Sequence, residues 1–327
     1  MVGLALALGS AVWLLRHQPG ASSPMAPSVE SARNTGLMSP GRVSTIRREA
    51  GTGNTHLSPA GEPGSMPAAV AMTPLVPGRI SLVVNGNGSA GFAERVNAVH
   101  AIGPDLTTEE NDAFYRYLQT PAKDSPDAEG ENWLRNEMLD KLVQQAVVTN
   151  ALSQLFVALY RDTAQDDVLR DYAVQHMAPV YVRVDANEQA GLQAALWQAV
   201  GETDTSIAGT ALLALCELAQ TNPEFDKSRI AEAALKLAGD EQSGELARIT
   251  AVQMCGRMGV TSAAPVVLQL AQNSGSVPLR IAAIAALGDV GDGETQPFLL
   301  QLAGGSDERL KPAAESALKR LQKRLGT

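Results

Sequence analysis

The sequence is poor in cysteine and in aromatic residues, and both shortages narrow the choice of fold. The 327 residues include only Cys216 and Cys255, and aromatic residues make up 4% of the chain. Both cysteines lie in apolar segments, so we expect buried small hydrophobic residues rather than a redox or metal site. The apolar residues are mainly Ala, Leu and Val, which suit closely spaced helices better than β-branched, aromatic-rich sheets. The composition favours an all-α fold.

Histidine is also scarce, and no sequence motif of catalysis is present. His17, His56, His100 and His176 are far apart in the sequence. We expect His176 to be a packing residue rather than a ligand. The chain has no G-x-S-x-G elbow, P-loop or C-x-x-C, and the GNGSAG of residues 86–91 is typical of a flexible turn. The sequence therefore predicts no catalytic, cofactor-binding or metal-binding residue, and a protein that is not an enzyme.

The charge is negative and unevenly distributed. The whole chain carries −9, but residues 16–79 hold six Arg against three Glu, which leaves −12 on the remainder. Nucleic-acid affinity comes largely from Lys and Arg that neutralise phosphates. We therefore do not expect a nucleic-acid partner.

The N-terminus predicts a membrane-directed segment. Residues 2–15 are apolar and uncharged, and Arg16 follows them. As a helix they would cover about 21 Å, less than the roughly 30 Å of a hydrocarbon core. Residues 1–16 are therefore a short membrane anchor or a signal segment. We expect a periplasmic or extracytoplasmic body. Positive charge favours the cytoplasmic side of a membrane segment, so Arg16 would place the body in the cytoplasm unless basic residues precede Val2.

Residues 17–79 are expected to be a disordered linker. They are rich in Pro, Gly and Ser and show no apolar periodicity. Such a segment cannot bury enough apolar surface to offset the entropy of ordering. The body of the protein would therefore be tethered rather than fixed.

An internal repeat occupies the C-terminal part of the chain. The segments 246–259 and 278–291 align without gaps, with Arg248 on Arg280. Lys311 takes this position in a third copy, and Arg170 and Gly209 take it in looser ones, at spacings of 39, 39, 32 and 31 residues along the chain. Second amphipathic segments follow each of the first four copies, at residues 188–200, 227–238, 263–272 and 295–303. Neighbouring hairpins of this kind must stack to cover their apolar faces.

The remaining helices are predicted from local signals. Residues 133–148 and 150–161 read as one more hairpin. Residues 106–119 begin with Thr107 and Glu110 at capping-box spacing. We therefore divide the body into a cap region, 80–129, and helical repeats, 130–327. Residues 80–84 read as a short strand without a visible partner, and are left unassigned.

The repeat resembles the HEAT family, in particular its short variant in phycobilin lyase-like proteins, whose units read R-x-A-A-x-A-L-G-x-x-G-D. RIAAIAALGDVGD at 280–292 matches this pattern closely. The resemblance implies a right-handed α-solenoid of antiparallel helical hairpins. It also implies that the second helix of each unit lines the inner curve, so the candidate partner-binding residues are Gln193, Gln198, Lys236, Gln269 and Gln301. HEAT-like hydroxylases bind iron through His-Glu pairs, and no His here is followed by Glu.

These observations favour a non-catalytic protein–protein interaction scaffold, a HEAT-repeat solenoid tethered to a membrane. The alternative is a lyase or other enzyme of the HEAT-like family that acts on a bound cofactor or protein. A HEAT-type DNA glycosylase would need a basic groove, which a body charge of −12 disfavours. The expected partners are a protein and a membrane, with no cofactor, metal or nucleic acid.

Overall fold

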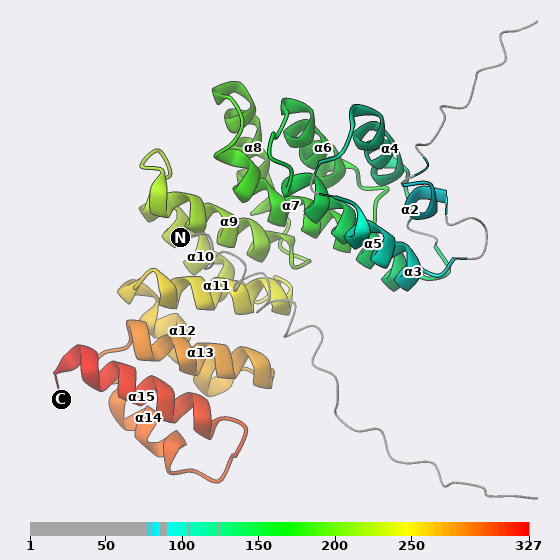
Figure 1. Cartoon of the computed structure of the whole chain (residues 1–327). Coiled ribbons are helices and arrows are strands. Elements are labelled where there is room, and N and C mark those ends of the chain that lie inside the picture. Colours follow the sequence, from blue (N-terminus) through cyan, green and yellow to red (C-terminus); the bar gives the residue numbers. More distant parts are fainter. Residues whose placement is uncertain (1–77, 79, 86–89, 104, 123–124, 327) are drawn as a thin grey trace, which may run out of the picture. The chain divides into compact units, whose positions relative to one another are not determined.

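The computed structural model describes residues 78, 80–85, 90–103, 105–122 and 125–326. These residues form fourteen α-helices and one 3₁₀-helix, and no strand lies among them (Figure 1). The all-α prediction is confirmed. The predicted anchor, 1–16, and all of the predicted linker except Gly78 lie outside the described residues. None of the described helices is both long enough and apolar enough to cross a membrane.

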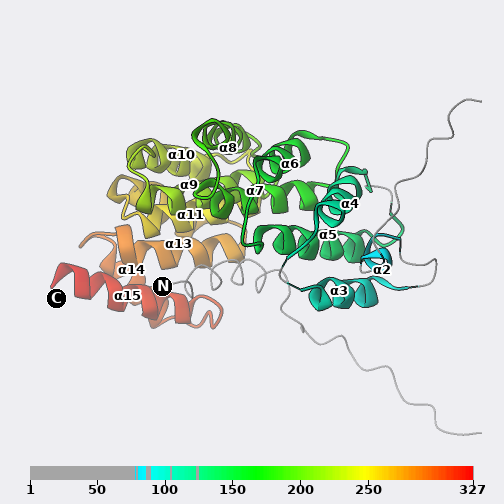
Figure 2. The same ribbon diagram turned by 45° about the horizontal axis from the view of Figure 1, so that its top comes forward.

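The helices alternate between two layers. The first layer contains α3 (Phe92–Ala101), α5 (Ala128–Val143), α7 (Asp167–Tyr181), α9 (Ile207–Thr221), α11 (Glu245–Arg257), α13 (Val277–Val290) and α15 (Lys311–Leu325). The second layer contains α2 (Ser81–Asn85), α4 (Thr108–Gln119), α6 (Asn150–Arg161), α8 (Ala186–Ala199), α10 (Lys227–Gly239), α12 (Ala264–Asn273) and α14 (Gln296–Ala303), with the 3₁₀-helix η2 (Thr261–Ala263) preceding α12. Each first-layer helix packs on the next, and Figure 2 shows α9, α11, α13 and α15 side by side. Stacked hairpins thus share one core, as predicted.

The hairpin begins one helix earlier than predicted. The sequence suggested a first-layer helix followed by a second-layer helix as the unit. In the structure α6 packs mainly on α7, α10 on α11, α12 on α13 and α14 on α15, so these four second-layer helices pair with the helix that follows them, whereas α8 packs almost equally on α7 and α9. The predicted bounds of the four later second-layer helices agree with α8, α10, α12 and α14 to within two residues.

The region 80–129 continues the same alternation. Residues 80–84, read as a possible strand, lie in or beside helix α2, because Ile80 and Val83 are three residues apart and both are buried. Thr107 and Glu110 form the predicted capping box at the start of α4. The predicted boundary at 130 falls inside α5, which starts at Ala128 rather than at 133.

A recurring arginine joins the two helices of a hairpin. Near the start or middle of five first-layer helices, an arginine donates to carbonyl oxygens at the C-terminal end of the preceding second-layer helix. We call these five contacts the arginine clamps: Arg95 to Val83 O at 2.8 Å, Arg135 to Leu118 O at 3.1 Å and Thr120 O at 2.8 Å, Arg170 to Tyr160 O at 2.8 Å, Arg248 to Ala238 O at 3.3 Å, and Arg280 to Ala271 O at 3.1 Å. The last carbonyl groups of a helix have no hydrogen-bond partner within it, so the arginines supply one. A cation at this end also interacts favourably with the helix dipole.

Glycines in this repeat mark close helix approaches more often than left-handed turns. Gly201, Gly239 and Gly304 stand at the ends of helices, where glycine commonly supplies a left-handed residue. Among the described glycines, only Gly259 and Gly326 have positive φ, 63° and 76°. The other glycines can end a helix without this conformation, because an exposed break needs no left-handed residue.

Candidate protein-binding surface

The five predicted partner-binding residues all lie on second-layer helices. Gln198, Lys236, Gln269 and Gln301 are exposed, whereas Gln193 is half-buried. Gln198 Oε1 accepts a hydrogen bond from Arg161 Nε at 3.2 Å, so it also joins α8 to α6. The residues are spread over four helices, and a partner would have to span the layer to contact them all. Their role in binding stays a prediction.

The packing of the layers favours the other face as the inner side. Neighbouring first-layer helices contact each other extensively from α3 to α15, whereas neighbouring second-layer helices contact each other sparsely. The curvature of a solenoid follows from the rotation between repeats, so a stack whose helices lie closer together in one layer curves toward that layer. Such concave surfaces are what repeat proteins use for binding. The first layer is therefore the better place to look for a partner surface.

A cluster of histidines and carboxylates crosses three adjacent first-layer helices. We call it the His–carboxylate cluster: His100 of α3, Glu137 and Asp140 of α5, and His176 of α7. His100 Nε2 lies 2.7 Å from Glu137 Oε2, and His176 Nε2 lies 3.6 Å from Asp140 Oδ1. Beside it, the Trp133 indole is 43% exposed, and its Nε1 donates to Glu137 Oε1 at 3.3 Å.

The two inner members of the cluster have shifted pKa values. Burial and the neighbouring Glu137 carboxylate raise the pKa of Asp140 to about 6, against a smaller opposing effect of His100. Burial lowers the pKa of His176 to about 4, so this ring is neutral at neutral pH. The His176 ring is 4% exposed and stacks on Phe156 with centroids 5.8 Å apart. Its Nε2 has no hydrogen-bond partner, because 3.6 Å is too long for one. The prediction that His176 is a packing residue is thus confirmed.

These shifts predict opposing pH effects on stability. Between pH 4 and 6.5 the unfolded chain protonates His176 and the folded chain does not, so stability rises with pH. Between pH 3.8 and 6 the folded chain retains the Asp140 proton and the unfolded chain does not, so stability falls with pH. Asp140→Asn removes only the second effect. We expect its free energy of unfolding, from urea titrations at pH 4.5 and 6.5, to rise more with pH than that of the wild type.

The matched control for this measurement is Glu241→Gln, which removes an exposed carboxylate outside the cluster. It should leave the pH dependence of stability unchanged. Equal pH dependence in the wild type and in Asp140→Asn would show that Asp140 ionises normally in the folded protein.

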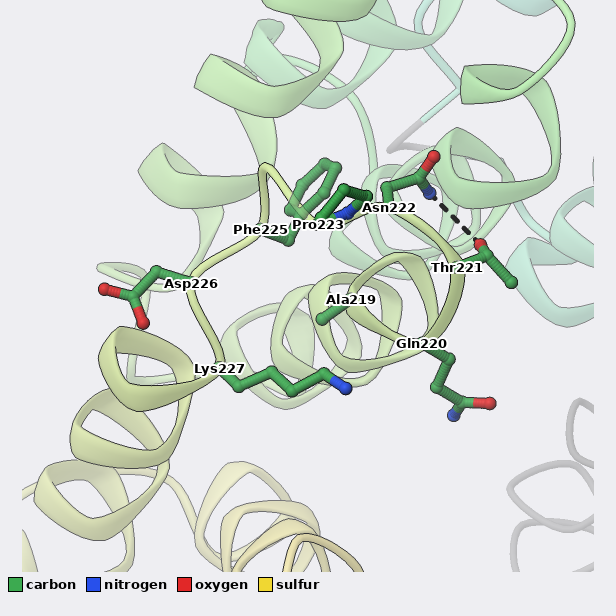
Figure 3. A pocket seen from close by; sticks show the side chains of 8 residues that line it. All are labelled: Ala219, Gln220, Thr221, Asn222, Pro223, Phe225, Asp226 and Lys227. Carbon is green, nitrogen blue, oxygen red and sulfur yellow. Dashed lines mark hydrogen bonds between the residues drawn. The ribbon is translucent and has the colours of Figure 1, made fainter.

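A hollow of about 520 Å³ lies at the loop between α9 and α10 (Figure 3). Its polar residues serve to end and start these helices. Asn222 Nδ2 donates to Leu218 O at 2.9 Å, and Asp226 Oδ1 accepts from the backbone N–H of Ser228 at 2.8 Å. In Figure 3 the side chains of Asp226 and Gln220 point away from each other. The lining groups thus stabilise helix ends and do not converge on a common point.

A second hollow, of about 640 Å³, lies where α4 meets α5. Tyr117, Glu131 and Arg135 line it and bond to one another. The Tyr117 hydroxyl donates to Glu131 Oε1 at 2.9 Å and accepts from Arg95 Nη2 at 2.6 Å, and Arg135 Nε donates to Glu131 Oε1 at 2.5 Å. Burial raises the pKa of Tyr117, and the Glu131 carboxylate adds to this effect. The sequence analysis missed this network, although Glu131 and Arg135 stand at the i, i+4 spacing of a helical ion pair.

Other polar residues and the two cysteines also have structural roles. Asp292 Oδ1 accepts from the backbone N–H of Glu294 at 3.0 Å and of Thr295 at 3.1 Å before α14. Asp289 accepts from Arg320 Nε at 3.0 Å, between α13 and α15. Cys216 and Cys255 are both buried and free. Among the described residues, no group of three or more His, Cys, Asp and Glu is arranged to hold a metal ion.

Comparison with known proteins supports the repeat assignment. Residues 231–319, from within α10 to within α15, match HEAT repeats, which confirms the resemblance in this part of the chain. No curated protein matches the sequence. Among solved structures, human deoxyhypusine hydroxylase in complex with glycerol is similar at 15% identity and a TM-score of 0.27, covering 71% of this chain and 97% of that one.

Proposed function

We propose that this HEAT-repeat chain is a non-catalytic scaffold that binds a partner protein through its first helix layer. The observation that supports it best is the Trp133 indole, 43% exposed beside His100 and Glu137 on the more closely packed layer. Partly exposed aromatic residues at the centre of polar groups are characteristic anchors of protein interfaces.

The use of the charged side chains also supports a scaffold. Five arginines form the clamps within hairpins, and Arg320 joins α13 to α15 through Asp289. Two hollows at helix ends are lined by groups that bond to each other or to the backbone. The charged side chains at the clamps and in the two hollows therefore stabilise the helix stack and not a reacting group. These contacts therefore support a scaffold better than they support an enzyme of the HEAT-like family.

The membrane association and the periplasmic or extracytoplasmic body are part of this proposal. They rest on the apolar sequence of residues 2–15 and on the composition of residues 17–79. Attachment would restrict the scaffold to partners near one membrane surface. Fractionation of cells that express the full chain would test this part, and recovery of the chain in the soluble fraction alone would contradict it.

Affinity capture with matched surface variants tests the proposed function. The bait is the full chain in a detergent extract of the native cells. A first-layer variant carries Trp133→Ala, and a second-layer variant carries Gln198→Glu, Lys236→Glu, Gln269→Glu and Gln301→Glu. We expect a specific protein that the wild type and the second-layer variant retain and that the first-layer variant loses.

Two outcomes would contradict this proposal in different ways. Loss of the protein from the second-layer variant alone would place binding on the face that the sequence predicted. Identical sets of proteins on all three baits would remove the support for a specific scaffold and favour a catalytic or small-molecule role.

A further inference from the structure

The two carboxylates of the His–carboxylate cluster face outward from one turn of α5. Glu137 and Asp140 are three residues apart and therefore share one face of the helix. The Asp140 side chain is 42% exposed and that of Glu137 is 23% exposed. The basic neighbour Lys141 directs its Nζ elsewhere and donates to Ile102 O at 2.5 Å. An approaching cation can reach both acids.

The buried His176 ring shows that this site is incomplete in the free protein. Its Nε2 points at Asp140 Oδ1 from the protein side, but at 3.6 Å the two atoms do not form a hydrogen bond. A buried polar atom without a partner is unfavourable, because it has lost its hydrogen bonds to water. A cation on the outer side of Asp140 would favour its ionised form near and below pH 6, and an ionised carboxylate accepts a hydrogen bond from an imidazole N–H. Ligand binding would then complete the contact.

We propose that Glu137 and Asp140 bind an arginine side chain from a basic segment of the partner protein, with its guanidinium against the Trp133 indole. This inference rests on the proposed function and names the chemistry of the partner. A guanidinium has five donors in a planar fork and also stacks on aromatic rings. The chain itself shows this pairing elsewhere, with the Arg229 guanidinium 3.8 Å from the centre of the Trp197 ring.

The charge of the whole body supports a basic partner. Outside residues 16–79 the chain carries −12. A field of this sign attracts cationic segments and raises their rate of association. The specific site then distinguishes an arginine from other cations, because it combines two carboxylates with an indole. His176 lies behind Asp140, with its Nε2 3.6 Å from Oδ1.

The site predicts a dependence of affinity on pH. His100 and Glu137 on its own face, Lys141 beside it and His176 behind it are the charged or titratable groups around Asp140. With a pKa of about 6, Asp140 is mostly ionised at pH 7.5 and mostly protonated at pH 5. Only about a tenth of the molecules would carry the ionised form at pH 5, so affinity should fall about tenfold over this range.

The test measures binding of a fluorescein-labelled hexa-arginine peptide to the full chain in detergent by anisotropy. The site variant is Glu137→Gln with Asp140→Asn, and the matched control is Glu232→Gln with Glu241→Gln, which removes two exposed acids elsewhere. We expect the site variant to bind the peptide about tenfold more weakly or worse and the control to change by less than about twofold. Trp133→Ala should weaken hexa-arginine more than hexa-lysine, and the tenfold effect of pH should be lost in Asp140→Asn.

Equal weakening by the site and control variants would show diffuse attraction to an acidic surface and would overturn the inference. If the double variant does not fold, Asp140→Asn alone gives the same comparison, since it neutralises one exposed group. A partner captured by the wild type and retained by Glu137→Gln with Asp140→Asn would refute the arginine site and leave the scaffold standing. If the wild type itself captures no specific protein, the scaffold is refuted instead.

Discussion

Arg135→Met is expected to lower the free energy of unfolding by about 3–5 kcal/mol. Arg135 is 3% exposed and its Nε donates to Glu131 Oε1 at 2.5 Å, while Glu131 is 6% exposed. Removal of the guanidinium leaves a buried carboxylate without its cation. It also releases the carbonyl oxygens of Leu118 and Thr120 at the end of α4. Urea unfolding followed by far-UV circular dichroism at pH 7 would measure the loss.

A double-mutant cycle separates the buried charge from the packing. Adding Glu131→Gln to Arg135→Met removes the stranded charge, so we expect it to restore part of the stability. Arg280→Met is the matched single change, because Arg280 is half-buried and its clamp is one bond to Ala271 O at 3.1 Å. It should cost only about 1 kcal/mol. Equal losses for Arg135→Met and Arg280→Met would show that the buried pair adds nothing to the clamp.

The sequence predicted the repeats in which the same residue types recur at the same positions of each hairpin. Arg248 and Arg280 align in the sequence because both clamp the preceding helix, and Gly256 and Gly288 align because both lie close to the next first-layer helix. Such constraints recur at a constant distance within each hairpin. They therefore appear as a period in one sequence.

The N-terminal hairpins were harder to predict because the same contacts are made there by less regular sequences. Arg95 and Arg135 are clamps, but their helices lack the Ala-rich core of later units, and α2 has only five residues. The prediction of which two neighbouring helices form a hairpin was also wrong. The helices alternate between the layers in the same way whether a second-layer helix pairs with the helix before it or the helix after it. Only the packing shows which neighbours pair.

The candidate site could not be predicted from spacing. Three helices, α4 to α6, lie between His100 and His176 in the sequence, and each histidine reaches a carboxylate of α5 only because α3, α5 and α7 stack in one layer. His176 was predicted from the sequence to be a packing residue, and it is buried. The position of Asp140 beside it was not predicted, since nothing local in α5 distinguishes Asp140 from a solvated helix residue. The contacts of the four side chains of the His–carboxylate cluster, which lie within one layer, follow no period of the sequence.

The last prediction concerns a glycine of the repeat motif. Gly288→Ala should lower the free energy of unfolding by about 1–3 kcal/mol. A Cβ at Gly288 would lie 2.8 Å from Ala317 Cα and 2.9 Å from Ala317 O, so α13 and α15 would have to separate. Backbone atoms cannot move aside as the end of a flexible side chain can. Guanidinium unfolding at pH 7 would measure the change.

Gly191→Ala in α8 is the matched control and should have the opposite sign. Gly191 is an exposed helical glycine, and a Cβ there would meet nothing within 4 Å. Alanine should therefore stabilise by about 0.5–1 kcal/mol, because glycine loses more backbone entropy on folding. If both substitutions stabilise the protein, then the motif glycine reflects no close approach of α13 and α15. If only Gly288→Ala destabilises it, the motif glycine is required by the short distance between α13 and α15. That distance determines how neighbouring first-layer helices stack.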